Sequence, residues 1–177
     1  MGAYSHAQRG QSGGSNRAII WAAKKPQRSR REDTTNWERQ VSLVNVEYPQ
    51  DRTAVVTLNR PERLNAMSID LVIELNEALN AIAANNEVSV VVLTGSGRGF
   101  CSGLDLKDYG IIPNIDGLSV GRIAQRSMRY YSRLIPTMRQ MPQPIICAVN
   151  GPAFGGGMCL TLGAELRIAS ESAEFNA

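Results

Sequence analysis

The chain has 177 residues, enough for one domain with a hydrophobic core. Its formal net charge of +3 is uneven, because residues 1–31 hold seven Lys or Arg and no Asp or Glu, which leaves 12 basic and 16 acidic side chains elsewhere. An acidic balance in the folded part argues against a nucleic-acid partner, and no apolar run is long enough to cross a membrane, so we expect neither nucleic acid nor membrane as a partner.

The cysteine and histidine content limits the chemistry. Cys101, Cys147 and Cys159 form no CxxC pair and are odd in number, a pattern typical of reduced thiols in the cytoplasm. The single histidine is His6, so the folded part cannot supply a His-based metal site or a Ser–His pair. We therefore expect no metal.

Residues 1–36 are rich in Gly, Ser, Gln and Arg, and we predict a disordered basic extension ahead of a domain at 37–177. A transit peptide to an organelle matrix is one interpretation, since the segment is Arg-rich and lacks acids. A plain flexible extension is the other, and it is favoured because no clear amphipathic helix is present.

The first half of the domain alternates strands and a helix. Segments 41–46 and 54–59 alternate apolar and polar residues, which predicts a hairpin around a turn at 49–52. Ser68 is a suitable N-cap for a helix that ends near residue 85. The β-branched run at 88–94 predicts a strand buried on both faces.

The second half repeats this order. A helix is expected over 119–141, then a strand at 145–149 and a helix that continues through Leu160. Segments 166–169 and 173–175 are typical of short strands. The order of elements indicates an α/β domain. Because the chain ends inside an expected strand with no closing helix, we predict an incomplete domain.

Two expected strands each lead into a glycine-rich turn, at 97–106 and 150–157. Glycine lets the backbone approach a ligand, and a helix N-terminus offers unpaired N–H groups. Two such turns together can direct two N–H donors at one oxygen, as an oxyanion hole requires. Tight helix–strand packing is the alternative. A nucleotide site is disfavoured, because neither G-x-G-x-x-G nor Gly-Lys-Ser/Thr is present.

Three segments in order resemble the crotonase (enoyl-CoA hydratase/isomerase) superfamily over roughly residues 41–177. They are NRPERLNAM at 59–67, GRGFCSGLDL at 97–106 and NGPAFGGG at 150–157. The resemblance implies a spiral of ββα units, with the C-terminal helical part missing here, and assembly as trimers or hexamers. Because the family's C-terminal helices complete the pocket and the trimer interface, it also implies that this chain exposes apolar surface and is unstable or inactive alone. It also implies an acyl-CoA substrate, no separate cofactor, and hydratase or isomerase activity in fatty-acid metabolism.

The same resemblance implies roles for seven residues. The backbone N–H groups of Ser102 and Gly156 would bind the thioester oxygen. The stretch Ser102, Gly103, Leu104 and Asp105 would line the adenine and pantetheine region. Arg63 and Leu64 would flank coenzyme A. All seven are therefore expected to contact the substrate.

The chain departs from the hydratase pattern at Cys159, where hydratases of the family have their first catalytic glutamate. A thiol is a poor substitute for a carboxylate, and we interpret Cys159 as a small buried residue. The second glutamate would fall just after residue 177. Isomerases that lack the first glutamate keep an isomerase reaction open, whereas a non-catalytic coenzyme A-binding or assembly subunit is the alternative.

Several other side chains have two interpretations. Arg122, Arg126, Arg129 and Arg133 lie at helical spacing and could meet a coenzyme A phosphate or an acidic partner, but a solvated face is favoured. Tyrosines border the acyl pocket or complete the core. Asp105 and Asp108 form a conceivable metal pair, but Asp105 is better explained as a turn cap, and Glu165 as structural. The tyrosines in question are Tyr109, Tyr130 and Tyr131.

Overall fold

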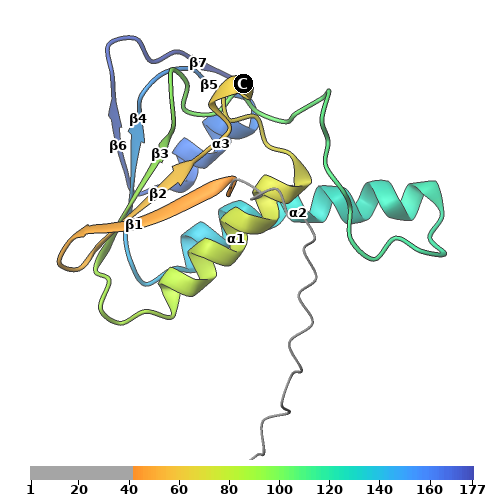
Figure 1. The fold of residues 1–177 in the computed structure, drawn as a ribbon, viewed down its shortest axis with the longest axis horizontal. Coiled ribbons are helices and arrows are strands. Elements are labelled where there is room, and N and C mark those ends of the chain that lie inside the picture. Colours follow the sequence, from red (N-terminus) through yellow and green to blue (C-terminus); the bar gives the residue numbers. More distant parts are fainter. Residues whose placement is uncertain (1–41) are drawn as a thin grey trace, which may run out of the picture. The chain divides into compact units, whose positions relative to one another are not determined.

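The computed structural model describes residues 42–177, and the predicted disordered extension at 1–36 lies outside them. The described part has a five-stranded sheet in the order β1-β2-β3-β4-β6 and a two-stranded sheet of β5 and β7 (Figure 1). The strands are β1 Val44–Gln50, β2 Thr53–Leu58, β3 Val90–Gly95, β4 Ile145–Val149, β5 Ala153–Phe154, β6 Leu166–Ala169 and β7 Phe175–Asn176. The helices are the 3-10 helix η1 Pro61–Arg63, α1 Ile69–Ala83, α2 Val120–Gln140 and α3 Gly156–Gly163.

The predicted hairpin is confirmed, because β1 and β2 are antiparallel. Strand β1 starts later than expected and continues to Gln50, so the turn is shorter than the predicted one. The pairs β2–β3, β3–β4 and β4–β6 are all parallel. Parallel neighbours need crossover connections, and these are supplied by α1, α2 and α3. The α/β class predicted from the order of elements is confirmed.

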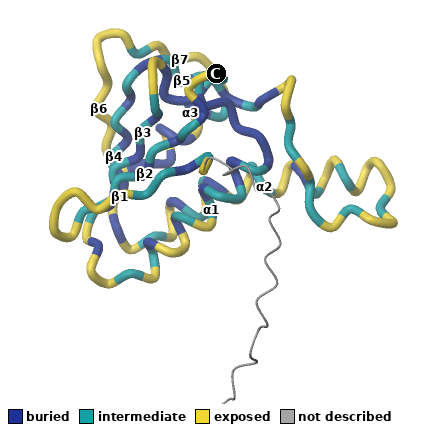
Figure 2. Tube along the Cα trace, in the orientation of Figure 1, coloured by how far each residue is buried: buried dark blue, intermediate teal, exposed yellow. Residues whose placement is uncertain are grey.

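The core lies between the sheet and helices α1, α2 and α3 (Figure 2). Helix α1 buries one stripe at helical spacing, and Leu71, Leu75 and Leu79 are fully buried. Strand β3 alternates: Val91 and Leu93 are buried, whereas Val92 is only half-buried. The prediction that this strand is buried on both faces is therefore wrong for the described residues, because these helices cover one face only.

Two short strands at the edges of the fold differ in how well the sequence predicts them. Strand β5 was not expected, because two residues are too short to show a period. Strand β6 agrees with the predicted range but is exposed along its whole length. Among residues 42–177, no helix is both long and apolar enough to cross a membrane.

Candidate functional site

The two glycine-rich turns lie together because the strands before them are neighbours. Strands β3 and β4 run parallel, so their carboxyl ends reach the same edge of the sheet. The N–H groups of Phe100 and Cys101 both donate to the carbonyl oxygen of Pro152 at 3.1 Å. The N–H of Phe154 donates back to Cys101 at 2.9 Å. The predicted meeting of the two turns is confirmed.

Glycine is required where the two turns approach most closely. Gly103 has a φ of +93°, and a Cβ atom there would lie 2.9 Å from the carbonyl oxygen of Phe154. A Cβ atom on Gly157 would overlap the carbonyl oxygen of Cys101. Because both obstacles are backbone atoms, α3 can begin against the first turn only with glycine at these positions.

The segment at 59–67 contributes a third piece of backbone. Met67 donates its N–H to the carbonyl of Gly103 at 2.7 Å and accepts from the N–H of Asp105 at 3.0 Å. These two bonds form a parallel bridge between Met67 and Leu104. The N–H of Leu104 takes no part in the bridge, and it has no hydrogen-bond partner within residues 42–177.

The predicted donor role of Ser102 is wrong in this structure. Its N–H already donates to the carbonyl of Leu64 at 3.0 Å, and its hydroxyl donates to the carbonyl of Arg63 at 3.4 Å. Ser102 therefore attaches the first turn to the segment after β2. The missed donor candidate is Leu104, two residues further on, and only the direction of each peptide group separates the two.

Gly156, the other predicted donor, is the first residue of α3. The first N–H groups of a helix lack intrahelical partners, and that of Gly156 has none in the described part of the chain. A Cβ atom on Gly156 would overlap the terminal methyl of Met67 and lie 3.5 Å from Cδ1 of Leu104. Gly156 and Leu104 are thus neighbours, and the donor role of Gly156 stays a prediction.

An apolar pocket of about 420 Å³ opens beside these two residues. Helices α2 and α3 form most of its wall. The lining residues are Met67, Leu104, Met128, Tyr131, Ser132, Leu134, Ile135, Gly156, Cys159 and Leu160. The lining contains no carboxylate.

A more polar groove of about 350 Å³ adjoins the pocket, because Leu104 lines both. The groove is lined by Glu62, Arg63, Leu64, Ala66, Arg98, Ser102, Leu104, Asp105, Leu106 and Lys107. Five of the seven residues expected to contact the substrate lie here, namely Arg63, Leu64, Ser102, Leu104 and Asp105. Gly103 lies outside both linings, and Gly156 lines only the apolar pocket.

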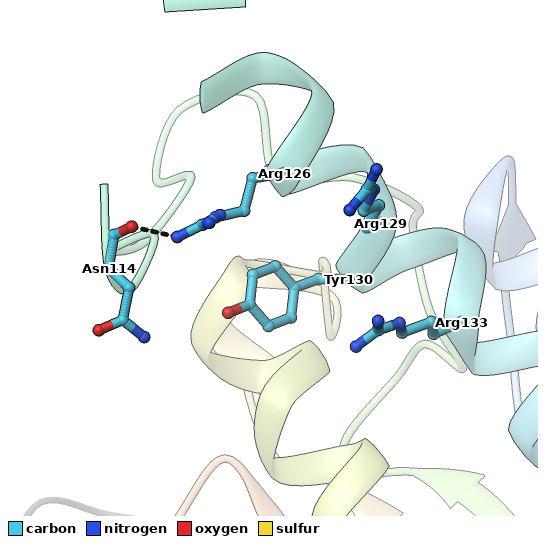
Figure 3. A pocket seen from close by; sticks show the side chains of 5 residues that line it. All are labelled: Asn114, Arg126, Arg129, Tyr130 and Arg133. Atoms are coloured by element: carbon cyan, nitrogen blue, oxygen red, sulfur yellow. Dashed lines mark hydrogen bonds between the residues drawn. The ribbon is translucent and has the colours of Figure 1, made fainter. Parts of the chain in front are cut away.

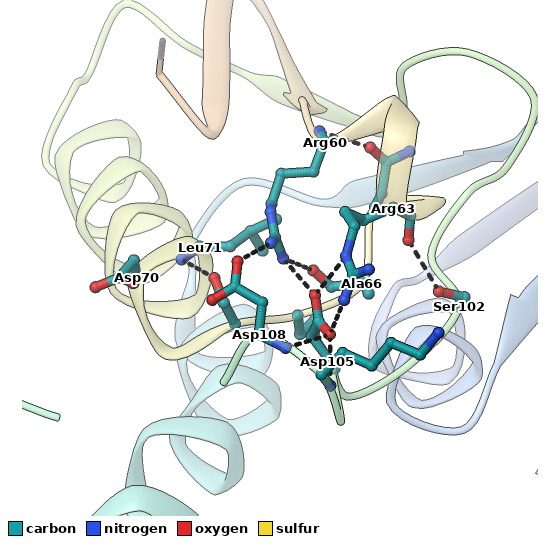
Figure 4. A network of polar contacts seen from close by, with 12 residues as sticks. Arg60, Arg63, Ala66, Asp70, Leu71, Ser102, Asp105 and Asp108 are labelled. Carbon is teal, nitrogen blue, oxygen red and sulfur yellow. Dashed lines mark hydrogen bonds and ion pairs between the residues drawn. The ribbon is translucent and has the colours of Figure 1, made fainter. Parts of the chain in front are cut away.

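A network of ion pairs and hydrogen bonds includes Arg63 and Asp105 of the groove lining (Figure 4). The guanidinium of Arg60, only 7% exposed, donates to Asp105 at 3.1 Å, to Asp108 at 2.7 Å and to the carbonyl of Ala66 at 2.8 Å. Arg63 donates to both carboxylate oxygens of Asp105, which is 2% exposed. This bidentate geometry joins the segment after β2 to the first glycine-rich turn.

Asp105 is ionised by its surroundings. Burial opposes its charge, but hydrogen bonds from Arg63 and from the N–H groups of Asp108 and Lys107 outweigh burial and hold the pKa of Asp105 well below its usual range. The predicted turn-capping role of Asp105 is confirmed. Among residues 42–177, no group of His, Cys, Asp or Glu side chains could hold a metal ion.

The thiols differ in their surroundings. Burial raises the pKa of Cys101 to about 11 and that of Cys147 to about 12, so both are inert at neutral pH. Cys159 is exposed and lines the apolar pocket, so its interpretation as a buried residue is wrong. The reason is that α3 buries its other side against the core, through Leu160.

The structure also shows the contacts of Tyr131 and Glu165, two other residues considered in the sequence. Tyr131 lines the apolar pocket and donates its hydroxyl to the carbonyl of Met67 at 3.2 Å, and burial, aided by Tyr109, raises the pKa of this phenol. Glu165 accepts from the N–H of Ile145 at 2.8 Å and pairs with Arg139, so its structural interpretation is confirmed.

Known proteins resemble the chain in both sequence and fold. It is 47% identical over 152 residues to a probable enoyl-CoA hydratase, EchA12, from Mycobacterium tuberculosis, covering 86% of this chain and 53% of the relative. It is 40% identical over 120 residues to 1,2-epoxyphenylacetyl-CoA isomerase from Escherichia coli, covering 68% and 45%. The chain therefore spans about half the length of these curated relatives.

A solved structure agrees. The crystal structure of a probable enoyl-CoA hydratase/isomerase from Mycobacterium abscessus superposes with a TM-score of 0.70 at 48% identity, covering 76% of this chain and 49% of that one. The family model described as enoyl-CoA hydratase/isomerase matches residues 49–177. These residues include the two glycine-rich turns and the segment at 59–67. The chain thus belongs to the crotonase (enoyl-CoA hydratase/isomerase) superfamily.

Proposed function

We propose that this chain binds an acyl-CoA thioester and polarises its carbonyl group with the backbone N–H groups of Leu104 and Gly156. The observation that carries the proposal is the position of Leu104, which lines both the polar groove and the apolar pocket. A thioester joins a polar carrier to an apolar acyl chain, so its carbonyl belongs where two such cavities meet.

The two cavities suit the two ends of this ligand. The apolar pocket accepts the acyl chain, with Met128 and Ile135 on its wall. The polar groove accepts the pantetheine and nucleotide portion, and Arg63, Arg98 and Lys107 supply positive charge for its phosphates. Coenzyme A enters as part of the substrate, and no separate cofactor is proposed.

The chemistry proposed is proton transfer at the carbon next to the thioester carbonyl, as in hydratases or isomerases of fatty-acid metabolism. Removing or adding that proton passes through an enolate, whose oxygen two N–H donors would stabilise. One such donor contributes about 3–4 kcal/mol to lowering a barrier. The free thiols suggest a reducing compartment such as the cytoplasm, with a trimer or hexamer as the proposed assembly.

A binding subunit without turnover is the second candidate. It is favoured by Cys159, which stands at the pocket wall in the position of the first catalytic glutamate of the family's hydratases. Assays of hydration and isomerisation on 2-enoyl-CoA and 3-enoyl-CoA separate the two candidates. Turnover of either substrate excludes the second candidate.

The test of the site is calorimetric titration of the full chain with butyryl-CoA and octanoyl-CoA. In Gly156→Ala the added methyl meets Met67 at the proposed carbonyl position, so we expect binding about tenfold weaker or more. Gly121→Ala is the matched control, because a Cβ atom at Gly121 meets nothing within 4 Å. Equal affinities in the two variants would contradict the proposed carbonyl position.

A further inference from the structure

Helix α2 carries an unbalanced row of positive charge. Its residues Val120–Gln140 include five arginines and no Asp or Glu. Arg139 pairs with Glu165. The other four are Arg122, Arg126, Arg129 and Arg133, and none of them has an ion pair with any residue in the range 42–177. Their spacing of four, three and four residues places them on one side of the helix.

Three of these arginines surround a hollow of about 350 Å³ between α2 and the loop before it (Figure 3). Arg126 reaches across and donates to the backbone carbonyl of Asn114, which ties the loop to the helix. The lining residues are Asn114, Arg126, Arg129, Tyr130 and Arg133. The lining therefore combines three guanidinium groups with two neutral polar groups and has no carboxylate.

A second hollow of about 270 Å³ continues this surface toward the start of α2. It shares Arg126 and Arg129 with the first hollow and adds Arg122. Along the helix axis, Arg122 and Arg126 are separated by about 6 Å, from the rise of 1.5 Å per residue. Two linked phosphate groups therefore fit between neighbouring arginines of this row.

The charge pattern is unfavourable without an anion. Arg122 and Arg126 are four residues apart, Arg126 and Arg129 three, and Arg129 and Arg133 four, and like charges at these spacings destabilise a helix. A bound anion removes this repulsion. Guanidinium groups bind phosphate oxygens in pairs, and the phenol of Tyr130 adds a neutral donor.

We propose that these two hollows bind a small molecule with two phosphate groups. One phosphate lies among Arg126, Arg129 and Arg133, and Arg122 contacts the second. The site is distinct from the proposed acyl pocket, to which α2 contributes Met128, Tyr131 and Ile135 from another side of the helix. It does not depend on the proposed enzymatic function.

The test is calorimetric titration of the full chain with inorganic pyrophosphate at constant ionic strength. We expect saturable binding that is about tenfold weaker in Arg129→Gln and absent in the triple variant Arg126→Gln/Arg129→Gln/Arg133→Gln. Arg52→Gln is the control, because this substitution removes the same charge from an exposed position on the β1–β2 turn. Circular dichroism verifies the helix content of every variant. Arg129→Lys keeps the positive charge but loses the paired N–H donors of the guanidinium group, so it should bind pyrophosphate with intermediate affinity.

Competition identifies the source of the phosphates. If coenzyme A does not displace pyrophosphate from the wild type, the site binds a free organic diphosphate. If it does, the arginines of α2 bind the phosphates of coenzyme A in place of Arg63, Arg98 and Lys107. Both results support the site. Unchanged pyrophosphate affinity in the triple variant would overturn it. Binding of phosphatidylglycerol vesicles or polyglutamate without binding of pyrophosphate would also overturn it.

Discussion

Asp105 links the segment after β2 to the first glycine-rich turn through a single buried carboxylate. It accepts hydrogen bonds from Arg60 and Arg63 and from two backbone N–H groups. Removing one partner of a buried ion pair leaves the other charge without compensation, which costs more than the pair itself contributes.

Asp105→Asn should lower the free energy of unfolding by about 3 kcal/mol, the lower end of the range for buried pairs. The lower end applies because Arg63 is 32% exposed to water and Arg60 keeps its ion pair with Asp108, so both arginines stay partly compensated. Urea denaturation at pH 7 measures the change. Glu62→Gln, which removes an exposed charge nearby, is the control and should change little.

Comparing the wild type with Asp105→Asn also predicts how the free energy of unfolding depends on pH. The pKa of Asp105 is lower in the folded state than the unfolded value of about 3.9, so its stabilisation is fully present above that pH. It is lost as the pH falls through the folded pKa. The difference in unfolding free energy between wild type and Asp105→Asn should therefore shrink below about pH 4. A constant difference from pH 7 to pH 3 would contradict this account.

Gly157 shows how close approach restricts a single position. A Cβ atom there would overlap the carbonyl oxygen of Cys101, which is backbone and cannot rotate away. Gly157→Ala should therefore destabilise the fold by about 1–3 kcal/mol. The contrasting change is Gly121→Ala in α2, where space is open and the gain in helix propensity should stabilise by up to about 1 kcal/mol. Thermal denaturation of both variants checks the opposite signs.

At the scale of elements, the two long helices begin differently. Ser68 caps α1 with a side-chain oxygen that accepts from the N–H of Leu71 at 3.2 Å, and it is buried. Ser119 precedes α2 without any side-chain capping bond. The same residue type therefore has a structural role at one helix and none at the other.

Ser68→Ala should cost about 1 kcal/mol of stability, or somewhat more because the freed N–H is buried. Ser119→Ala is the matched control and should cost a few tenths of a kcal/mol at most. Chemical denaturation of both variants measures the difference. Equal losses would show that capping by Ser68 contributes nothing specific.

At the scale of the whole molecule, β6 forms one edge of the large sheet and presents apolar side chains to solvent. Leu166 is 59% exposed and Ile168 is 67% exposed, and Leu162 and Phe175 are also exposed nearby in sequence. An edge strand with apolar side chains readily pairs with another chain. Whether this surface makes the chain alone unstable or inactive stays a prediction.

Ile168→Lys should reduce self-association, since a charge on an edge strand opposes pairing between sheets. Sedimentation velocity across a range of protein concentrations measures the effect. Ile111→Lys is the control, because Ile111 is 78% exposed but lies in a loop rather than at the edge of the sheet. A similar decrease in both variants would show that net charge, and not the edge strand, governs association.

Local patterns were enough to predict most elements and the family. The helical stripe of α1, its cap at Ser68 and the β-branched strands depend on neighbours in sequence, which the chain displays directly. The three family segments lie in order within residues 59–157. Together they predicted an α/β domain with two glycine-rich turns at the carboxyl ends of neighbouring strands.

Tertiary structure alone decided which groups face the cavities. Ser102 and Leu104 are equally plausible donors in the sequence, but the bond from Ser102 to Leu64 and the bridge from Met67 leave only the N–H of Leu104 free. Cys159 is exposed at the pocket because of how α3 packs. These outcomes depend on contacts between residues far apart in the chain. The orientation of a peptide group cannot be inferred from the type of residue that carries it.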